Sequence, residues 1–486
     1  MCRFIRCSVC RHLGALDISD HDHGSGSVPQ PDIDVRSPPG QFTPPYSVRV
    51  KEWPNPISLV IGKRRRDAAY GFPEQAFEQP YTRRKFFNRN IHMVSDPDII
   101  AHVLLHNQQN FVKPDFLQRV LRPMIGQGLF TAERQHWRTQ RRIVAPTFKP
   151  SAIASLIVPI AEIAKRQTAA WPSTRTRIDM AEQASGAALE VISDTLFSQD
   201  ARLVSPAART RLDAMLAAVG KSPIATLLGL PEFSLHPSFW HGRRGQKHLR
   251  GAIGEMIDER LEQSRNDGFF GGLVHSLYEQ FSAEEARALA IDNALTFYVA
   301  GHETTAVTLS WTIFLLAAQP ALQDLARAEA TAALKSDLSS LAEHLPLLRQ
   351  IIEESMRLYP PAHRIERQAL ADDQVNDILI KQGDLVSIWP MLLHRHKTLW
   401  RNPDTFDHTR FSEEAKASQH RFQYIPFGAG PRICVGASMA MAETLIVIAH
   451  WIAARRFELD DGHVVVPTAG VTLRPANGMP LIVSPI

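Results

Sequence analysis

One cysteine, Cys434, lies between a glycine-rich loop and an apolar run, residues 437–452, that is typical of a helix. Backbone N–H groups at the start of a helix point toward such a side chain, and the helix dipole favours a thiolate over a thiol. Gly428, Gly430 and Gly436 let the main chain turn sharply and let a flat group lie against it. A thiolate held in this way suits an iron ligand, and a haem iron in particular.

The loop from Phe427 to Gly436 matches every fixed position of the pattern Phe-x-x-Gly-x-Arg-x-Cys-x-Gly. This pattern resembles the haem loop of the cytochromes P450, the haem-thiolate monooxygenases. The resemblance implies that Cys434 is the axial iron ligand of haem b and that Phe427, Arg432 and Gly436 contact the haem. The residues alone leave an alternative, a loop around a buried structural cysteine, because free cysteine often packs as a small hydrophobe.

A second polar patch, Ala-Gly-His-Glu-Thr-Thr at 300–305, interrupts an apolar helical pattern over about residues 285–318. Glycine costs a helix interior about 1 kcal/mol relative to alanine, and a threonine hydroxyl can bond the i−4 carbonyl and bend the helix. The zinc-protease motif His-Glu-x-x-His is excluded, because Ala306 occupies its last position. The alternative is a polar patch in a core helix with a structural role only, which explains these residue types poorly.

The same patch resembles the acid–alcohol motif of the family. The resemblance implies that Ala300 and Gly301 border the haem. It also implies that Glu303 and Thr304 are catalytic and manage the protons that oxygen activation requires.

Several arginines are placed to bind haem propionates. Trp137 and Arg141 are one helical turn apart, and a planar guanidinium suits a carboxylate. The resemblance implies propionate contacts for this pair, for Arg367 and for Arg432. The family usually has glycine where Arg134 precedes the Trp137 helix, which puts the local turn in doubt.

A third motif concerns the scaffold. Glu354 and Arg357 are three residues apart on one helix, close enough to pair. The resemblance implies a structural triad of Glu354, Arg357 and Arg410 that braces the core behind the haem loop. His363 falls where relatives line the substrate pocket, so substrate contact and a surface loop position are both open for it.

Composition excludes several classes of protein. The 486 residues have a formal net charge of +4, too mild to predict nucleic acid as a partner. Four cysteines make a disulfide framework improbable and favour a reducing compartment. No run of 18 uninterrupted apolar residues is present, and no signal peptide is visible. We therefore expect a cytoplasmic protein without a membrane anchor.

Residues 1–45 are rich in Gly, Ser and Pro and predict a poorly ordered extension. Cys2, Cys7 and Cys10 have a spacing similar to some iron–sulfur ligands, and zinc with nearby histidines is another reading. Incidental cysteines in a disordered tail are the favoured interpretation.

The resemblance implies a mainly α fold with small β-sheets, in which residues 46–486 form a single large helical catalytic domain around a buried haem. The implied reaction inserts one atom of O2 into a small hydrophobic organic substrate. Electrons would come from a separate ferredoxin or flavodoxin with its NAD(P)H reductase, and the protein would be monomeric. A peroxide-driven peroxygenase and a non-enzymatic haem sensor or carrier are the alternatives.

Overall fold

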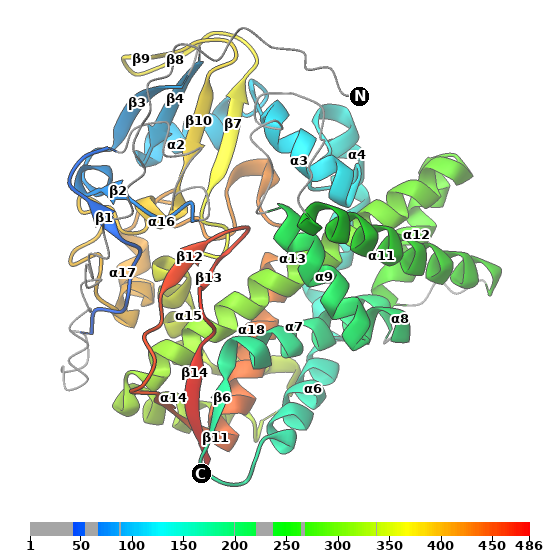
Figure 1. Cartoon of the computed structure of the whole chain (residues 1–486), viewed down its shortest axis with the longest axis vertical. Coiled ribbons are helices and arrows are strands. Elements are labelled where there is room, and N and C mark those ends of the chain that lie inside the picture. The colour runs from blue at the N-terminus through cyan, green and yellow to red at the C-terminus, as the bar shows by residue number, and fades with distance from the viewer. Residues whose placement is uncertain are drawn as a thin grey trace, which may run out of the picture.

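The computed structural model describes residues 42–53, 67–86, 89–198, 200–219, 237–263, 268–336 and 338–486. Helices dominate it, and small sheets lie along one side and at one end (Figure 1). The expected mainly α fold with small β-sheets is confirmed. The longer helices are α3 (Asp115–Ile125), α4 (Arg134–Val144), α6 (Ile157–Ala170), α7 (Met180–Phe197), α9 (Pro206–Val219), α11 (Pro237–Glu262), α12 (Gly268–Gln280), α13 (Ala283–Ala317), α14 (Pro320–Ala333), α15 (Pro346–Leu358) and α18 (Ala437–Ala454).

Short helical segments connect these elements. Asp96 caps α2 by accepting hydrogen bonds from Asp98 N and Ile99 N. The short segments are α2 (Pro97–Ala101), α5 (Pro150–Ala154), α8 (Ala201–Val204), α16 (Pro390–Leu393), α17 (Glu413–Ala417), the π-helical η3 (His102–His106), and the 3-10 segments η2 (Glu74–Phe77), η4 (Ala145–Phe148), η5 (Leu338–His344), η6 (His408–Phe411) and η7 (Gly430–Arg432).

Helix α13 is the central element of the fold and packs against α7, α11, α12, α15 and α18. Ser282 caps its start, and Glu284 and Glu285 in the first turn complement the positive end of the helix dipole. Most of its side chains are buried, because neighbours cover it on several sides. The helix predicted over 285–318 is therefore confirmed and carries the polar patch through the middle of the molecule.

Helix α18 begins directly after Gly436 and packs against α6, α13 and α14. Among the described residues it is the one single helix long and apolar enough to cross a membrane, and two bent helix pairs pass the same test when each is taken as one span. Its apolar side chains are mostly buried in the core. Burial against other helices accounts for its composition.

The described residues also form five small sheets. The largest has the order β3-β4-β10-β7-β5, in which β10 and β4 are parallel and the other pairs antiparallel. A three-stranded sheet has the order β11-β14-β6, and the pairs β1-β2, β8-β9 and β12-β13 form the rest. The strands are β1 (Arg49–Val50), β2 (Phe72–Pro73), β3 (Tyr81–Phe86), β4 (Arg89–Val94), β5 (Phe111–Val112), β6 (Thr176–Asp179), β7 (Ile365–Ala369), β8 (Asp373–Val375), β9 (Ile378–Ile380), β10 (Leu385–Ile388), β11 (Arg455–Leu459), β12 (Pro467–Ala469), β13 (Leu473–Pro475) and β14 (Pro480–Pro485).

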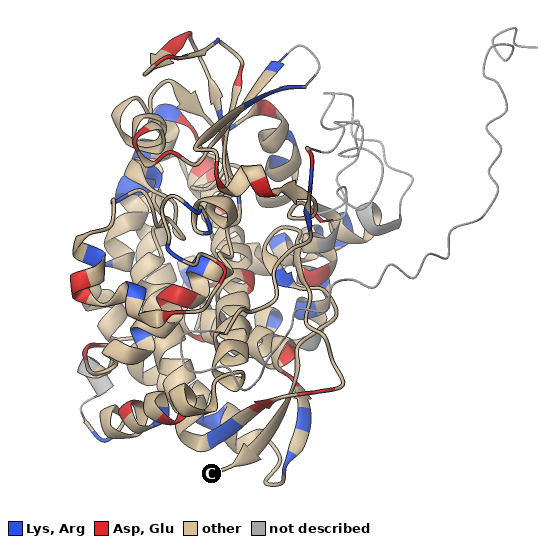
Figure 2. Cartoon of the chain, turned by 90° about the vertical axis from the view of Figure 1, so that its left-hand side faces the viewer, with Lys and Arg blue, Asp and Glu red and all other residues tan. Residues whose placement is uncertain are grey.

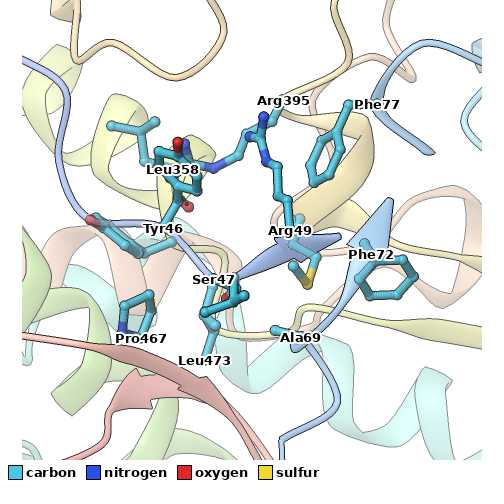
Figure 3. Close-up of a pocket in the computed structure, with 13 residues that line it drawn as sticks. Tyr46, Ser47, Arg49, Ala69, Phe72, Phe77, Leu358, Arg395, Pro467 and Leu473 are labelled. Atoms are coloured by element: carbon cyan, nitrogen blue, oxygen red, sulfur yellow. Dashed lines mark hydrogen bonds between the residues drawn. The ribbon is translucent and has the colours of Figure 1, made fainter. Parts of the chain in front are cut away.

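Most of the predicted extension, residues 1–41 with its three cysteines, lies outside the described residues. Residues 42–45 are described and pack on the helical body: Phe42 is buried, and the Tyr359 hydroxyl donates to Pro45 O at 2.6 Å. Next to this contact, Asp404 accepts from Arg49 at 2.5 Å and from Arg395 at 2.9 Å. The cavity here measures about 20 Å³ (Figure 3), room for about one water molecule, so this cluster is structural.

Charged residues of both signs are mixed over the face shown in Figure 2. This distribution agrees with the mild net charge of the chain.

Candidate active site

The loop before α18 holds Cys434 in a fixed position. Gly428 and Gly430 have φ values of +72° and +70°, which side-chain-bearing residues rarely adopt. A Cβ at Gly430 would also collide with the carbonyl oxygen of Leu104, so this position requires glycine. Cys434 N donates to Phe427 O at 2.9 Å and closes the loop. The sharp turn predicted from the glycines is thus present at two of the three.

A cavity of about 400 Å³ adjoins the cysteine. It collects nearly all the predicted cofactor and catalytic residues from α4, α13, β7 and the Cys434 loop. Those that line it are Trp137, Arg141, Ala300, Gly301, Thr304, Arg367, Phe427, Arg432, Cys434 and Gly436.

 Trp137 and Gly436 border the same cavity although they are 299 positions apart in the sequence, so only the tertiary fold brings them together.

The Cys434 side chain is exposed only in the sense that it borders this internal cavity. Burial raises the pKa of the thiol, while the Gly436 N–H that points at the sulfur and the nearby Arg141 charge lower it. The predicted N–H contact is present, but burial outweighs it. The protein alone therefore favours the thiol, and a bound metal ion must supply the charge that keeps a coordinating sulfur deprotonated.

Three cations and one carboxylate gather at another wall of the cavity. Arg432 donates to Glu133 at 2.5 Å and to Ala132 O at 3.0 Å, and it lies 4.5 Å from the ring centre of Trp137. Lys113 lies 3.5 Å from Glu133. Burial and the charges of Arg432 and Arg367 lower the pKa of Lys113 to about 7. Burial and Arg432 lower the pKa of Arg367 to about 10.

This wall carries more positive charge than Glu133 can balance. Such crowding is costly in a buried site unless an anion is bound. Haem fits this arrangement: its two propionates would lie against Lys113, Trp137, Arg367 and Arg432, and Cys434 would hold its iron. Sequence analysis missed Lys113 and Glu133. Their only signal was nearness to the predicted pocket segments and to Trp137.

The α4 helix is fixed against α13 by a polar network. Asp292 accepts from Gln127 N at 2.6 Å, and Asn293 accepts from Leu129 N at 2.8 Å. Asn293 also donates to Gln140 on α4 at 2.9 Å. These contacts anchor the loop before α4, so Trp137 and Arg141 face the cavity.

The polar patch of α13 forms part of the cavity wall. The Thr304 hydroxyl donates to Ala300 O at 2.6 Å, the i−4 bond expected from the sequence. A Cβ at Gly301 would collide with Ile192 on α7, so this glycine permits close packing of α7 on α13 as well as access to the cavity.

Glu303 is the one predicted catalytic residue that does not line the cavity. It accepts from the Thr472 hydroxyl at 2.8 Å, and its second oxygen is buried without a hydrogen-bond partner among the described residues. Burial raises the pKa of its carboxyl. The structure therefore separates Glu303 from Thr304, although the two are adjacent in sequence.

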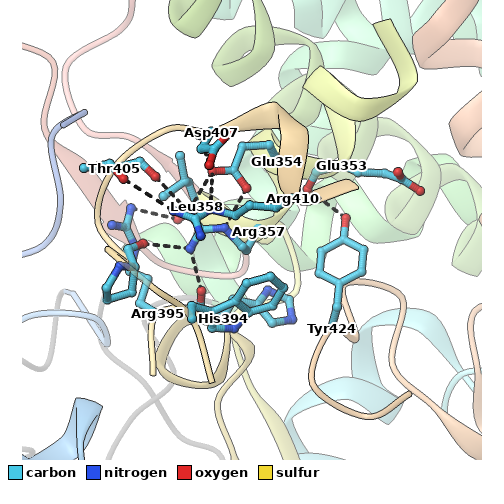
Figure 4. Close-up of polar contacts among 12 residues, drawn as sticks. Glu353, Glu354, Arg357, Leu358, His394, Arg395, Thr405, Asp407, Arg410 and Tyr424 are labelled. Atoms are coloured by element: carbon cyan, nitrogen blue, oxygen red, sulfur yellow. Dashed lines mark hydrogen bonds and ion pairs between the residues drawn. The ribbon is translucent and has the colours of Figure 1, made fainter. Parts of the chain in front are cut away.

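The predicted triad is assembled where α15, which carries Glu354 and Arg357, meets η6, which carries Arg410 (Figure 4). Arg357 makes two hydrogen bonds to Glu354, at 2.6 and 2.7 Å, and both side chains are fully buried. Arg410 is the looser member, with its Nε 3.6 Å from Glu354. Arg357 also donates to the carbonyl oxygens of His394, Pro403 and Thr405. One guanidinium therefore fixes the backbone at three positions.

Two further residues differ from the sequence interpretation. His363 is buried beside Trp389 and does not line the cavity, whereas its neighbours Ala362 and Arg364 do.

Sequence analysis missed Glu443, the only acidic residue of α18. It lines the cavity and bonds to Thr305, and burial raises its pKa to about 8. An acidic residue in an apolar helix was the available signal.

Arg134 occupies the position before the Trp137 helix where the family usually has glycine. Arg134 is exposed and has a φ of +50°, a left-handed conformation that disfavours any residue with a Cβ. We expect Arg134→Gly to raise the free energy of unfolding by about 0.5–1 kcal/mol, because relief of strain exceeds the added entropy of the unfolded chain. Thermal unfolding of the haem-loaded protein measures this. Arg134→Ala is the matched control, which keeps the strain; a glycine variant no more stable than the alanine variant would contradict the explanation.

Comparisons with known proteins identify the family of this chain. A family model described as "Cytochrome P450" matches residues 61–480. Cytochrome P450 714C3 from Oryza sativa subsp. japonica is 28% identical over 410 residues, covering 80% of this chain and 79% of the relative. A cytokinin hydroxylase from Arabidopsis thaliana is 28% identical over 412 residues, covering 81% of this chain and 78% of the relative. The crystal structure of the cytochrome P450DA heme domain has a TM-score of 0.75 at 21% identity, covering 91% of this chain and 98% of that one, which shows the shared fold. The chain belongs to the cytochrome P450 family.

Proposed function

We propose that this cytochrome P450 hydroxylates a small hydrophobic organic substrate, with electrons from a separate ferredoxin or flavodoxin and its NAD(P)H reductase. The observation that carries the proposal is the cavity itself, which joins Cys434 and Thr304 to an apolar lining. Its apolar lining includes Leu117, Leu129, Phe130, Ile192, Leu196 and Phe297. The cytokinin hydroxylase among the relatives supports hydroxylation as the reaction type.

Family membership establishes the coarser function: the protein is a haem-thiolate monooxygenase whose cofactor is protohaem with a cysteine thiolate as axial ligand. When bound, such a haem activates O2 and inserts one oxygen atom into the substrate, while the other leaves as water. In our proposal the apolar wall excludes water and holds the substrate. Thr304 presents a hydroxyl at the cavity, and Glu303, which accepts from Thr472 outside the cavity wall, supplies a protonatable group of raised pKa.

Turnover under defined conditions tests the proposal. Substrates would be chosen from fatty acids, terpenoids and aromatics by the spin shift that each induces in the haem spectrum. With a surrogate ferredoxin or flavodoxin, its reductase, NADPH and ¹⁸O2, we expect one ¹⁸O atom in each product molecule. Product with hydrogen peroxide but none with the redox proteins would indicate a peroxygenase. Substrate binding without product in either assay would indicate a sensor or carrier.

We further propose that α4 contributes to the docking face for the redox partner. Arg138 and Arg142 are exposed on α4, while Trp137 and Arg141 of the same helix line the cavity. Reversing both charges, Arg138→Glu with Arg142→Glu, should lower the association rate with an acidic ferredoxin about tenfold or more at low salt, because steering depends on complementary charge. Stopped-flow reduction at several salt concentrations measures this. Reversal of the exposed Arg175, which directly precedes β6 in the sequence, is the control; equal effects of the two changes on the association rate would refute the assignment.

The cytoplasmic location and the monomeric state remain proposals. The small number of cysteines supports a reducing compartment. The predicted absence of a membrane anchor concerns mainly residues 1–41, which lie outside the described residues.

A further inference from the structure

Within the described part of the chain, five basic side chains line the cavity, and Arg364 lies apart from the other four. The charges of Arg432 and Arg367 lower the pKa of Lys113, and that of Arg432 lowers the pKa of Arg367. Glu133 acts on all three of these cations, and Arg141 interacts with Cys434. Arg364 does not contribute to any of these shifts. Its charge acts instead on Glu366 and His363. Arg364 is therefore outside the cluster that fits the haem propionates.

Two contacts hold the Arg364 guanidinium, one at its Nε atom and one at its planar face. The Nε atom lies 3.4 Å from Glu366 Oε1, and the guanidinium lies 5.2 Å from the ring centre of Trp389. Its side chain keeps a relative exposure of 38% and borders the cavity. Among the hydrogen bonds of the described residues, none is donated by its two terminal nitrogens. The part of the guanidinium suited to binding two oxygens is thus available.

Glu366 balances this charge only in part. The Ser387 hydroxyl donates to Glu366 Oε1 at 2.6 Å, the same oxygen that faces Arg364, and Ser387 itself accepts from Trp389 Nε1 at 2.7 Å. Burial raises the pKa of Glu366, which further weakens its negative charge. The Trp389–Ser387–Glu366 chain positions the guanidinium rather than neutralising it.

We propose that Arg364 binds the carboxylate of the substrate, so that the substrates are amphiphilic organic acids. A planar guanidinium matches a carboxylate with two parallel hydrogen bonds. The apolar body of the acid would occupy the wall formed by Leu117, Leu129, Phe130 and Phe297. This inference rests on the proposed function, because it names the substrate class for the same cavity.

The test measures binding and needs no turnover. Imidazole attached to the end of an alkanoic acid coordinates haem iron, which produces a spectral shift for every ligand in the series. The probes are imidazolyl-alkanoic acids with 8, 10 and 12 carbons and their primary amides, titrated into the haem-loaded protein at pH 7.5. A hydrogen bond to a charged group is about twice as strong as one between neutral groups. We therefore expect at least one acid to bind about tenfold or more tightly than its amide.

Arg364→Gln should bring that acid-to-amide ratio to about one while haem content stays unchanged, and Arg364→Lys should retain part of the preference. Arg367→Gln is the matched control, expected to lower haem content and to leave the ratio intact. No acid preference at any chain length would overturn the proposal. The proposal would also be overturned if Arg364→Gln lowered the haem content and weakened the binding of acids and amides by the same factor, so that the acid-to-amide ratio stayed unchanged. Retained acid preference without turnover would overturn the proposed function alone.

Discussion

Glu354→Ala is expected to abolish accumulation of the folded, haem-containing protein. The substitution removes both hydrogen bonds from Arg357, at 2.6 and 2.7 Å, and leaves that guanidinium fully buried without its carboxylate. It also removes the acceptor for Asp407 N at 2.8 Å, which fixes the segment leading to Arg410. Breaking a buried ion pair in this way costs about 3–5 kcal/mol. A domain is stabilised by only about 5–15 kcal/mol in total, so the loss is a large share.

The measurements are the haem content of the soluble fraction and the thermal unfolding of any protein recovered. Glu162→Ala is the matched control, because Glu162 and Lys165 form an exposed pair with the same three-residue spacing. Exposed pairs contribute about 0–1 kcal/mol, so this variant should resemble the parent protein. A haem-loaded Glu354→Ala protein with near-normal stability would refute the structural role of the triad.

Cys434→Ser is expected to reduce turnover to the background rate of haem without its thiolate and to remove the far-red-shifted Soret band of the reduced carbon monoxide complex. Serine has the same shape but cannot supply the electron-rich sulfur that favours oxygen activation. The loop geometry should survive, because the 2.9 Å bond from residue 434 N to Phe427 O involves the backbone alone. The effect should therefore appear in the spectrum and in turnover, while stability changes less.

The carbon monoxide difference spectrum of the dithionite-reduced protein measures this change. A variant with Cys2, Cys7 and Cys10 all replaced by serine is the control, expected to keep the parent band and activity. Cys434 is the only free cysteine among the described residues. A red-shifted band that persists in Cys434→Ser would contradict its role as iron ligand.

The sequence alone was sufficient for features that depend on neighbours along the chain. The Cys434 loop is compact because Gly428 and Gly430 supply backbone conformations that other residues avoid. The helix over 283–317 and the Glu354–Arg357 pair follow from helical periodicity. These signals are local, so spacing predicted them, and the family resemblance supplied the fold and the haem.

Only the tertiary structure decided which side chains share the cavity. Lys113 and Arg432 are far apart in the chain, and no local pattern predicts that both approach Glu133. Thr304 and Glu303 are adjacent, yet successive helical residues point about 100° apart, so one borders the cavity and the other bonds to Thr472. His363 is buried while Arg364 faces the cavity for a similar reason, since neighbouring side chains on an extended segment point to opposite sides. The direction in which each side chain points depends on how distant elements pack around it, and a single sequence does not contain that information in local form.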